Sequence, residues 1–363
     1  MIEGFRCSPV GPLDAKIVIV GEAPGEEEER VGVPFVGPAG GLLNAFLAEA
    51  GIERAECYVT NVFKQRPPNN DLLSWCGSKK EVGGAAYPYP VYKAPGKYIL
   101  PERATPALEE LAEELSAIRP NLVIALGNTA CWALLRTSGI SALRGTINPC
   151  ALVSGLKVLP SYHPAAILRA WDLKPIALMD FKKAAREARF REIQIPSRWI
   201  CATPSRADLD WFWWRWLQRA QIISVDIETE KNTITCIGFS PSPTVSLVIP
   251  FFDKTKEGWH YWEKAEDERA AWLLVRRILE SPSRKLFQNG LYDLQYLWRV
   301  AKIATNMGDG GGEDTMLLHH SLQPELQKSL GFMGSVYCNA PAWKGMLAAS
   351  RRIKAKDVDK DDL

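Results

Sequence analysis

The sequence has 363 residues, of which 47% are hydrophobic, and a formal net charge of +2 at pH 7. That length allows two hydrophobic cores, and no apolar run is long enough to cross a bilayer, so we expect a two-domain protein without a membrane partner. Without a basic-then-apolar signal segment we expect it in the cytoplasm, or in a host cytoplasm if it is viral; its small net charge restricts any nucleic-acid surface to a local patch.

The first half of the chain alternates strands and helices. Apolar, β-branched runs predict buried strands at 17–20, 58–63, 122–126 and 157–160. Apolar residues at helical spacing predict helices at 42–50 and 176–191, a short helix that ends near 135, and a helix from Pro106, capped by Thr105, to 118. This alternation predicts a parallel sheet with helices on both faces. Residues 71–103 have no clear period and are expected to form a long loop.

The second half has a different pattern. Pro196 and Pro204 lie among polar residues, so we assign residues 1–192 to a first domain, 193–205 to a linker and 206–363 to a second domain. Runs at 222–228, 233–239 and 244–252 predict an antiparallel meander. A helix at 267–279, a strand at 285–288 and a helix at 291–300 are expected to follow.

The cysteines do not form a recognisable framework. All eight are dispersed, at positions 7, 57, 76, 131, 150, 201, 236 and 338, without a Cys-x2-Cys pair. In a chain of this size this spacing favours reduced, structural thiols over disulfides or zinc ligands.

Several polar features coincide with the ends of the predicted parallel strands. They are the Gly21-Glu22-Ala23-Pro24-Gly25 loop, Asn61, the Lys64–Pro68 loop and His163. Singly, Asn61 could be a strand-end cap and His163 an ordinary loop residue. Because the carboxyl ends of parallel strands share one edge of the sheet, where α/β proteins bind their ligands, the set predicts a binding site.

These segments, with Pro34-Phe35-Val36-Gly37 and His163-Pro164-Ala165, resemble the family 4 branch of the uracil-DNA glycosylase superfamily, in order and over residues 10–190. The resemblance implies a three-layer αβα fold and a DNA repair enzyme that flips uracil out of single- or double-stranded DNA and hydrolyses its N-glycosidic bond. The residues that it implies at the base are Gly21, Ala23, Pro24, Gly25, Glu28 and Phe35.

The residue types suit this chemistry. An Asn61 amide can meet both O4 and N3–H of uracil, Phe35 offers a stacking face, and His163 can stabilise the charge that develops near O2. Other branches carry an aspartate at the position of Ala23, so we take Glu22 as the candidate for water activation. The resemblance gives Glu28 a role in excluding the thymine methyl, although it could equally be a solvated acid of the Glu26–Glu29 run.

The DNA contacts expected outside the base pocket are Lys64, Arg66 and Arg169. Family 4 members usually hold a [4Fe-4S] cluster on four cysteines, but Cys7 stands alone here, so we expect no cofactor for the glycosylase. Residues 71–103 have no counterpart in the family. Their lysines and tyrosines, Tyr92 among them, could contact single-stranded DNA, or the segment could be a plain surface loop.

Asp226 and Glu228 lie two residues apart on a predicted strand, so both carboxylates face one side of it. The segments around Asp226, Asp293 and Asp314 resemble the 3′-5′ exonuclease domain of phage-type family A DNA polymerases, over about residues 198–347. The resemblance implies a ribonuclease H-like mixed sheet and Mg²⁺ or Mn²⁺ on Asp226, Glu228 and Asp293, with Asp314 as a further candidate. Its third motif, Tyr-x3-Asp, is missing, since Pro341 follows Tyr337 by four.

Four tryptophans between 210 and 217 could stack on bases or pack as an aromatic helix. The function expected for the chain is therefore uracil excision, with an exonuclease-like module that binds DNA. Two alternatives stay open: a proofreading exonuclease subunit that serves a separate DNA polymerase, and a non-catalytic DNA-binding accessory protein.

Overall fold

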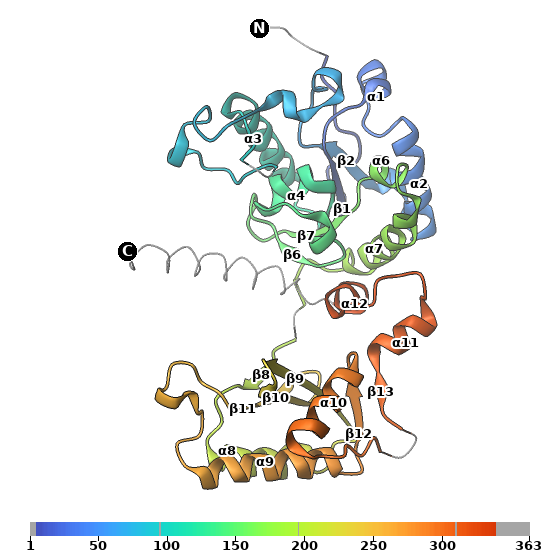
Figure 1. The fold of residues 1–363 in the computed structure, drawn as a ribbon. Coiled ribbons are helices and arrows are strands. Elements are labelled where there is room, and N and C mark those ends of the chain that lie inside the picture. The colour runs from blue at the N-terminus through green and yellow to red at the C-terminus, as the bar shows by residue number, and fades with distance from the viewer. Residues whose placement is uncertain (1–4, 94–95, 195, 309–310, 339–363) are drawn as a thin grey trace. The chain divides into compact units, whose positions relative to one another are not determined.

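A computed structural model describes residues 5–93, 96–194, 196–308 and 311–338. The chain divides into two compact units (Figure 1). The first contains the described residues up to 194 together with 331–338, and the second contains 196–330. No helix in the described part of the chain is long and apolar enough to cross a membrane.

The first unit is built on a five-stranded sheet in the order β2-β1-β5-β7-β6. The strands β1 (Ile17–Gly21), β2 (Cys57–Asn61), β5 (Leu122–Leu126) and β7 (Lys157–Ser161) are parallel, and the short β6 (Asn148–Pro149) is antiparallel to β7. The four predicted strands are thus confirmed. Their continuous burial is the pattern of a sheet that is covered on both faces.

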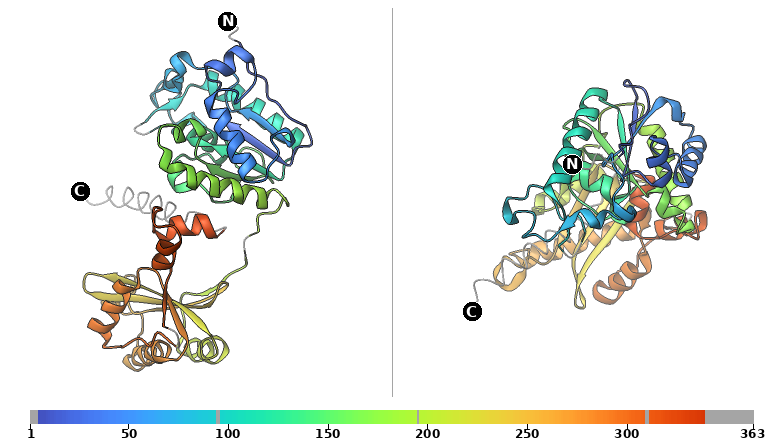
Figure 2. Two further views of the ribbon diagram at one scale, coloured as in Figure 1. Left: turned by 90° about the vertical axis from the view of Figure 1, so that its right-hand side faces the viewer. Right: turned by 90° about the horizontal axis from the view of Figure 1, so that it is seen from above.

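Alternate residues of the strands pack into two separate hydrophobic cores. Val18 and Val20 pack in a cluster with α3 (Pro101–Ile118) and α4 (Gly127–Leu135), whereas Ile17 and Ile19 pack with α2 (Pro38–Glu49) and α7 (Lys174–Glu187). Because successive side chains of a strand point to opposite faces, this division makes a three-layer αβα arrangement (Figures 1 and 2). The short helices α1 (Glu26–Val31), α5 (Ile140–Leu143) and α6 (Pro164–Ile167) lie in the loops.

The helix expected from Pro106 begins earlier. Pro101 occupies the first turn of α3, and Pro106 lies inside the helix. Pro101 stands where the backbone N–H has no helical partner, whereas Pro106 removes one helical hydrogen bond and is tolerated inside the helix. Ala104, between the two prolines, is fully buried.

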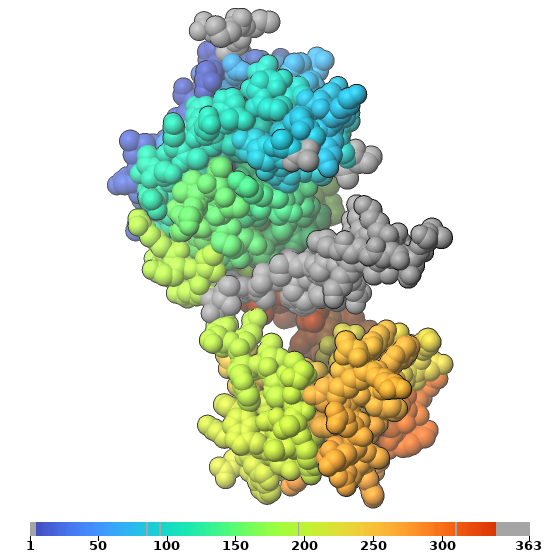
Figure 3. All heavy atoms as spheres, turned by 90° about the vertical axis from the view of Figure 1, so that its left-hand side faces the viewer, coloured from blue at the N-terminus to red at the C-terminus, as the bar shows by residue number. Residues whose placement is uncertain are grey.

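The expected long loop contains short ordered elements. A 3-10 turn (Leu72–Trp75) leads into β3 (Cys76–Gly77), which pairs antiparallel with β4 (Tyr98–Ile99). We call residues 71–100 the insertion. It lies on the outer surface of the first unit, where Figure 3 shows it in light blue.

The second unit contains a six-stranded mixed sheet in the order β13-β12-β9-β10-β11-β8. The predicted meander is confirmed as β9 (Ile222–Glu230), β10 (Thr233–Ser242) and β11 (Val245–Pro250). The remaining strands are β8 (Trp199–Cys201), β12 (Arg284–Phe287) and β13 (Glu313–Asp314). The helices are α8 (Arg206–Phe212), followed by a π-helical turn (Trp213–Leu217), α9 (Ala265–Glu280), α10 (Gly290–Ala301) and α11 (Thr315–Leu322).

Two expected boundaries differ from the structure. Part of the expected linker is β8, which pairs in parallel with β11. The segment 331–338, within α12 (Leu330–Tyr337) and just after it, packs with the first unit rather than the second. There Arg144 donates from Nη1 to Ser335 Oγ at 2.8 Å, and Lys183 donates to the backbone oxygens of Ser335 and Cys338. Tyr337, the first residue of the expected third exonuclease motif, is the last residue of α12, and Pro341 lies outside the described residues.

Candidate active site

A cavity of about 620 Å³ opens at the carboxyl ends of the parallel strands of the first unit. Strands β1, β2 and β7 each end at it, which brings together residues that lie far apart in sequence. The predicted residues that line it are Glu22, Ala23, Gly25, Glu28, Phe35, Asn61, His163 and Arg169. The predicted convergence on one edge of the sheet is thus present in the structure.

Phe35, Asn61 and Gly21 fit tightly together. A Cβ atom on Gly21 would lie 2.3 Å from Asn61 Oδ1 and 2.6 Å from Phe35 Cζ, so only a glycine leaves both side chains in place. The Phe35 ring stacks on His163 with centroids 5.6 Å apart. Asn61 is 4% exposed, at the end of β2. An apolar face and an amide, both buried, therefore meet at the cavity.

His163 has a defined tautomer. Its Nδ1 accepts a hydrogen bond from the Ala165 N–H at 3.2 Å, so in the neutral ring the proton is on Nε2. Burial, and next the positive charge of Arg169, lower the pKa of His163 to about 4. The imidazole is consequently neutral at pH 7 and can donate one hydrogen bond from Nε2 into the cavity.

Glu22 directly follows β1 and lines the cavity. Thr129, which is fully buried at the start of α4, donates a hydrogen bond to Glu22 Oε2. Burial raises the pKa of Glu22, and the Thr129 hydrogen bond opposes that rise. A carboxyl group held in this way can titrate closer to neutrality than an exposed glutamate.

Glu28 braces the loop that forms the cavity rim. Its Oε1 accepts from the N–H groups of Val36 and Gly37, both at 3.0 Å, and its Oε2 accepts from the Gly25 N–H at 3.1 Å. The carboxylate thus ties the start of α1 to the Phe35 loop and is not a freely solvated acid. Pro24 is buried beside this rim without lining the cavity.

The predicted DNA contacts separate into three environments. Lys64 is only 5% exposed. Its Nζ pairs with Glu114 at 2.8 Å and donates to Thr60 Oγ1 at 2.7 Å and to the backbone oxygen of Asn61 at 2.8 Å. The Lys64 prediction needs correction, because a buried, paired ammonium cannot reach a phosphate. Arg66 pairs with Glu29 at 3.1 Å, whereas Arg169 is exposed at the mouth of the cavity.

Other lining residues were not singled out by their sequence pattern. The insertion contributes Asp71, Tyr92 and Lys93, with Asn70 just before it, and the first turn of α4 contributes Asn128. Tyr92 and Lys93 belonged to a segment interpreted as either a DNA contact or a plain surface loop. Because that segment has no periodicity, only the tertiary structure shows that its Tyr92 and Lys93 line the cavity.

The described residues contain no group of three or more His, Cys, Asp or Glu side chains that could hold a metal ion. Cys7 and Cys57 are buried, Cys76 is half-buried, and burial raises the pKa of each thiol.

The acidic residues of the second unit lie as the alternation predicts. Asp226 and Glu228 are both on the exposed face of β9. Asp293 Oδ1 accepts from the Ile227 N–H at 3.1 Å, and burial, with Asp226 and Asp314 adding to it, raises the pKa of Asp293 to about 6. Asp314 instead accepts from the N–H groups of Asn289, Gly290 and Met316. Asp293 thus lies near both Asp226 and Asp314, yet among the described residues these carboxylates do not form a metal-ligand set.

The tryptophan segment is divided between two environments. Trp213 is buried, with the Arg277 guanidinium 4.0 Å from its ring centroid, while Trp211 and Trp214 are exposed. The segment thus packs partly as the aromatic helix that was one of the two interpretations.

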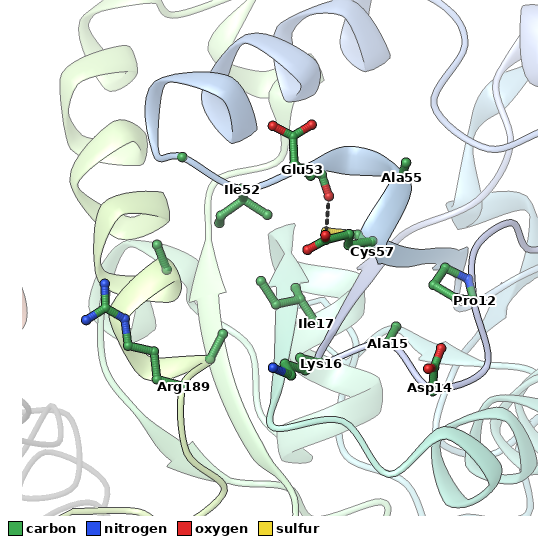
Figure 4. Close-up of a pocket in the computed structure, with 14 residues that line it drawn as sticks. Pro12, Asp14, Ala15, Lys16, Ile17, Ile52, Glu53, Ala55, Cys57 and Arg189 are labelled. Carbon is green, nitrogen blue, oxygen red and sulfur yellow. Dashed lines mark hydrogen bonds between the residues drawn. The ribbon is translucent and has the colours of Figure 1, made fainter.

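A second cavity, of about 530 Å³, lies at the opposite ends of the strands, where β1 and β2 begin (Figure 4). Its wall includes Lys16, Glu53, Cys57 and Arg189. None of the predicted site residues of the first unit lines it.

Comparison with known proteins agrees with this geometry. The model of the Uracil DNA glycosylase superfamily matches residues 8–191. The type-4 uracil-DNA glycosylase of Thermotoga maritima is 36% identical over 176 residues, which cover 48% of this chain and 78% of that protein. The type-4 enzyme of Archaeoglobus fulgidus is also 36% identical, over 180 residues, with 48% of this chain and 77% of that protein covered.

A longer match joins the two units. A DNA polymerase of Bacillus phage SP01 is 23% identical over 338 residues, which cover 85% of this chain and 33% of the polymerase. A match of that length extends past the glycosylase region into the second unit, as expected for a fusion with a phage polymerase module. On its family match, and with Phe35, Asn61 and His163 gathered at one sheet edge, the chain belongs to the uracil-DNA glycosylase superfamily.

Proposed function

We propose that the first unit removes uracil from DNA by hydrolysing the N-glycosidic bond of a flipped nucleotide. The observation that carries the proposal is that Phe35, Asn61, His163 and Glu22 line one cavity of about 620 Å³. A base must leave the stack before its glycosidic bond can be reached, and this cavity supplies the stacking face and polar groups that a flipped pyrimidine needs.

Each side chain has a role that its geometry supports. Asn61 would accept from uracil N3–H and donate to O4, while Phe35 stacks on the ring. When the C1′–N1 bond breaks, its electron pair stays on the uracil. The Nε2–H of the neutral His163 then donates to O2, where part of the negative charge accumulates.

Glu22 is the proposed partner of the attacking water. In this scheme the water oxygen bonds to C1′ and the water proton passes to the Glu22 carboxylate. The neighbouring Ala23 carries no group that could do this, so Glu22 is the acidic side chain of the Gly21–Gly25 loop that lines the cavity. Arg169, exposed at the mouth, is placed to contact a DNA phosphate.

The proposal is tested with end-labelled oligonucleotides that contain one uracil or one thymine, incubated in EDTA and then treated with alkali. We expect strand breaks only at uracil, and we expect Asn61→Ala to abolish them. Asn232→Ala, an exposed asparagine of the second unit, is the matched control and should cleave like the wild type. A wild-type protein that leaves the uracil strand intact would refute the proposal.

For the second unit we propose an exonuclease-like module that holds DNA, possessing nuclease activity only if its carboxylates can bind Mg²⁺ or Mn²⁺. The specific observations are the polymerase match and the mutual proximity of Asp226, Asp293 and Asp314. Digestion from a 3′ end that requires the metal and disappears in Asp226→Asn would support nuclease activity. DNA binding by the wild type without digestion in the presence of the metal would support a tether.

A further inference from the structure

The insertion forms part of the wall of the cavity. Tyr92 and Lys93 line it, and this stretch is anchored by a hydrogen bond from Trp132 Nε1 to the Pro90 oxygen at 3.0 Å. The Tyr92 N–H also donates to the Lys97 oxygen at 2.8 Å. Trp132 is buried on α4, so the insertion is fixed to the same helix that carries Thr129.

The hydroxyl groups on this wall form a chain with one direction. Tyr92 Oη and Thr129 Oγ1 are 2.9 Å apart, and Thr129 Oγ1 donates to Glu22 Oε2. A threonine hydroxyl has a single proton, and here that proton is directed to Glu22. Tyr92 must therefore be the donor to Thr129, and the chain runs from Tyr92 through Thr129 to Glu22.

We propose that Thr129 and Tyr92 are positioning residues for Glu22, and that the insertion thereby takes part in uracil excision. The chain holds one carboxylate oxygen of Glu22 in place and leaves the other for the attacking water. Since the chain can be completed only when Tyr92 donates, a segment outside the matched family motifs orients the group proposed to activate water. This inference depends on the excision activity proposed above.

Several charged and titratable groups surround Glu22, and together with the Tyr92–Thr129 hydrogen bonds they set the pKa of its carboxyl group. Asp71, Tyr92 and Lys93 come from the insertion, Arg169 and His163 from the residues after β7, and Glu28 from α1. A hydrogen bond to the charged form of a carboxyl group lowers its pKa. Loss of the Thr129 hydroxyl should therefore shift the titration of Glu22 to higher pH.

The test compares Thr129→Val, Thr129→Ser and Tyr92→Phe with the wild type in single-turnover excision across pH. We expect Thr129→Val to lower the maximal single-turnover rate constant about tenfold and to move the acid limb of the pH profile to higher pH, because one charge-assisted hydrogen bond is lost. The half-saturating protein concentration should change little. Tyr92→Phe should change the rate and the position of the acid limb in the same direction, but by less. Thr129→Ser should restore the wild-type rate and acid limb.

Tyr87→Phe is the matched control. Tyr87 belongs to the same insertion and donates to the Ile99 oxygen, away from the cavity, so its variant should retain the wild-type pH profile. A uniform loss of activity in Thr129→Val and Tyr92→Phe with an unmoved acid limb would overturn the proposal, since it would indicate a merely structural wall.

A second measurement does not depend on excision. The ¹³C carboxyl resonance of Glu22, assigned with Glu22→Gln, is followed through pH in the wild type and in Thr129→Val. A higher Glu22 pKa in the variant supports the chain, and an unchanged pKa overturns it. If the wild type does not excise uracil while this shift is present, the proposed function fails and the chain stands as a structural relationship.

Discussion

The ring of Phe35 stacks on the imidazole of His163, with centroids 5.6 Å apart and planes inclined by 30°. Phe35 adopts φ of 57°, a left-handed conformation that is costly for a bulky side chain. A Cβ atom on Gly40 would lie 1.9 Å from the Phe35 backbone oxygen, so a glycine is needed where α2 passes this close to the Phe35 backbone. The stacked rings of Phe35 and His163 are thus in place without a bound base, and the surrounding packing stabilises the strained backbone of Phe35.

Substituting Gly21 should close the base recess. The new Cβ of Gly21→Ala would lie 2.3 Å from Asn61 Oδ1, so the amide or the Phe35 ring must shift. Because a displaced amide no longer matches the edge of uracil, we expect excision to fall at least about a hundredfold, with the fold retained. The rate is measured on a uracil oligonucleotide, and circular dichroism reports the fold.

Gly41→Ala is the matched control for that change. Gly41 is in α2, and no atom lies within 4 Å of a Cβ built on it. Its substitution should leave excision unchanged and stabilise the protein by about 0.5–1 kcal/mol. Equal activity of Gly21→Ala and the wild type would contradict the assigned recess.

The titration of His163 should respond to Arg169. The folded-state pKa of about 4 is below the ordinary value of 6.5, so the unfolded chain binds more protons between these pH values. The contribution of the neutral His163 ring to the free energy of unfolding is therefore fully present above pH 6.5 and is lost as pH falls from 6.5 through 4. Arg169→Ala removes the second-largest cause of the lowered pKa, and NMR titration of the His163 ring should show a higher value.

Arg169 and Lys64 should behave differently toward DNA. We expect Arg169→Ala to weaken binding to an oligonucleotide and to reduce the slope of log K against log salt by about 1, as for one lost phosphate contact. Lys64→Met should instead lower the stability of the protein, because it leaves Glu114 buried without its cation. Fluorescence anisotropy at several salt concentrations distinguishes them; a salt slope altered only by Lys64→Met would reverse the assignment.

Asp180 should be among the most sensitive positions for stability. Its carboxylate is 1% exposed, pairs with Arg144, and accepts from Ser161 Oγ at 2.9 Å. Asp180→Ala leaves a buried guanidinium without its anion, so we expect a loss of about 3–5 kcal/mol in the unfolding transition of the first unit. Asp210→Ala breaks the exposed pair with Arg206 and should cost only about 0.3–0.5 kcal/mol. The measurement is the shift of the urea midpoint from the wild type, taken for the unit that carries each substitution. Equal shifts in the two variants would contradict this prediction.

The sequence by itself determined the elements and the edge at which they meet. Four buried runs such as Ile17–Val20 predicted parallel strands, and Asn61 and His163 at the ends of two of them predicted a shared site. These inferences succeed because strand periodicity and turn residues are local properties, and because parallel strands necessarily bring their carboxyl ends to one edge.

Only the tertiary structure decided which side chains face the cavity and which are buried beneath it. Lys64 and Arg169 are both cations near predicted strand ends, yet Glu114, a distant residue on α3, draws one into the interior. Tyr92 reaches Thr129 across 37 positions, and Ser335 meets Arg144 across 191. Such partners depend on long-range packing and on where each buried polar group can be satisfied, and no local pattern encodes either.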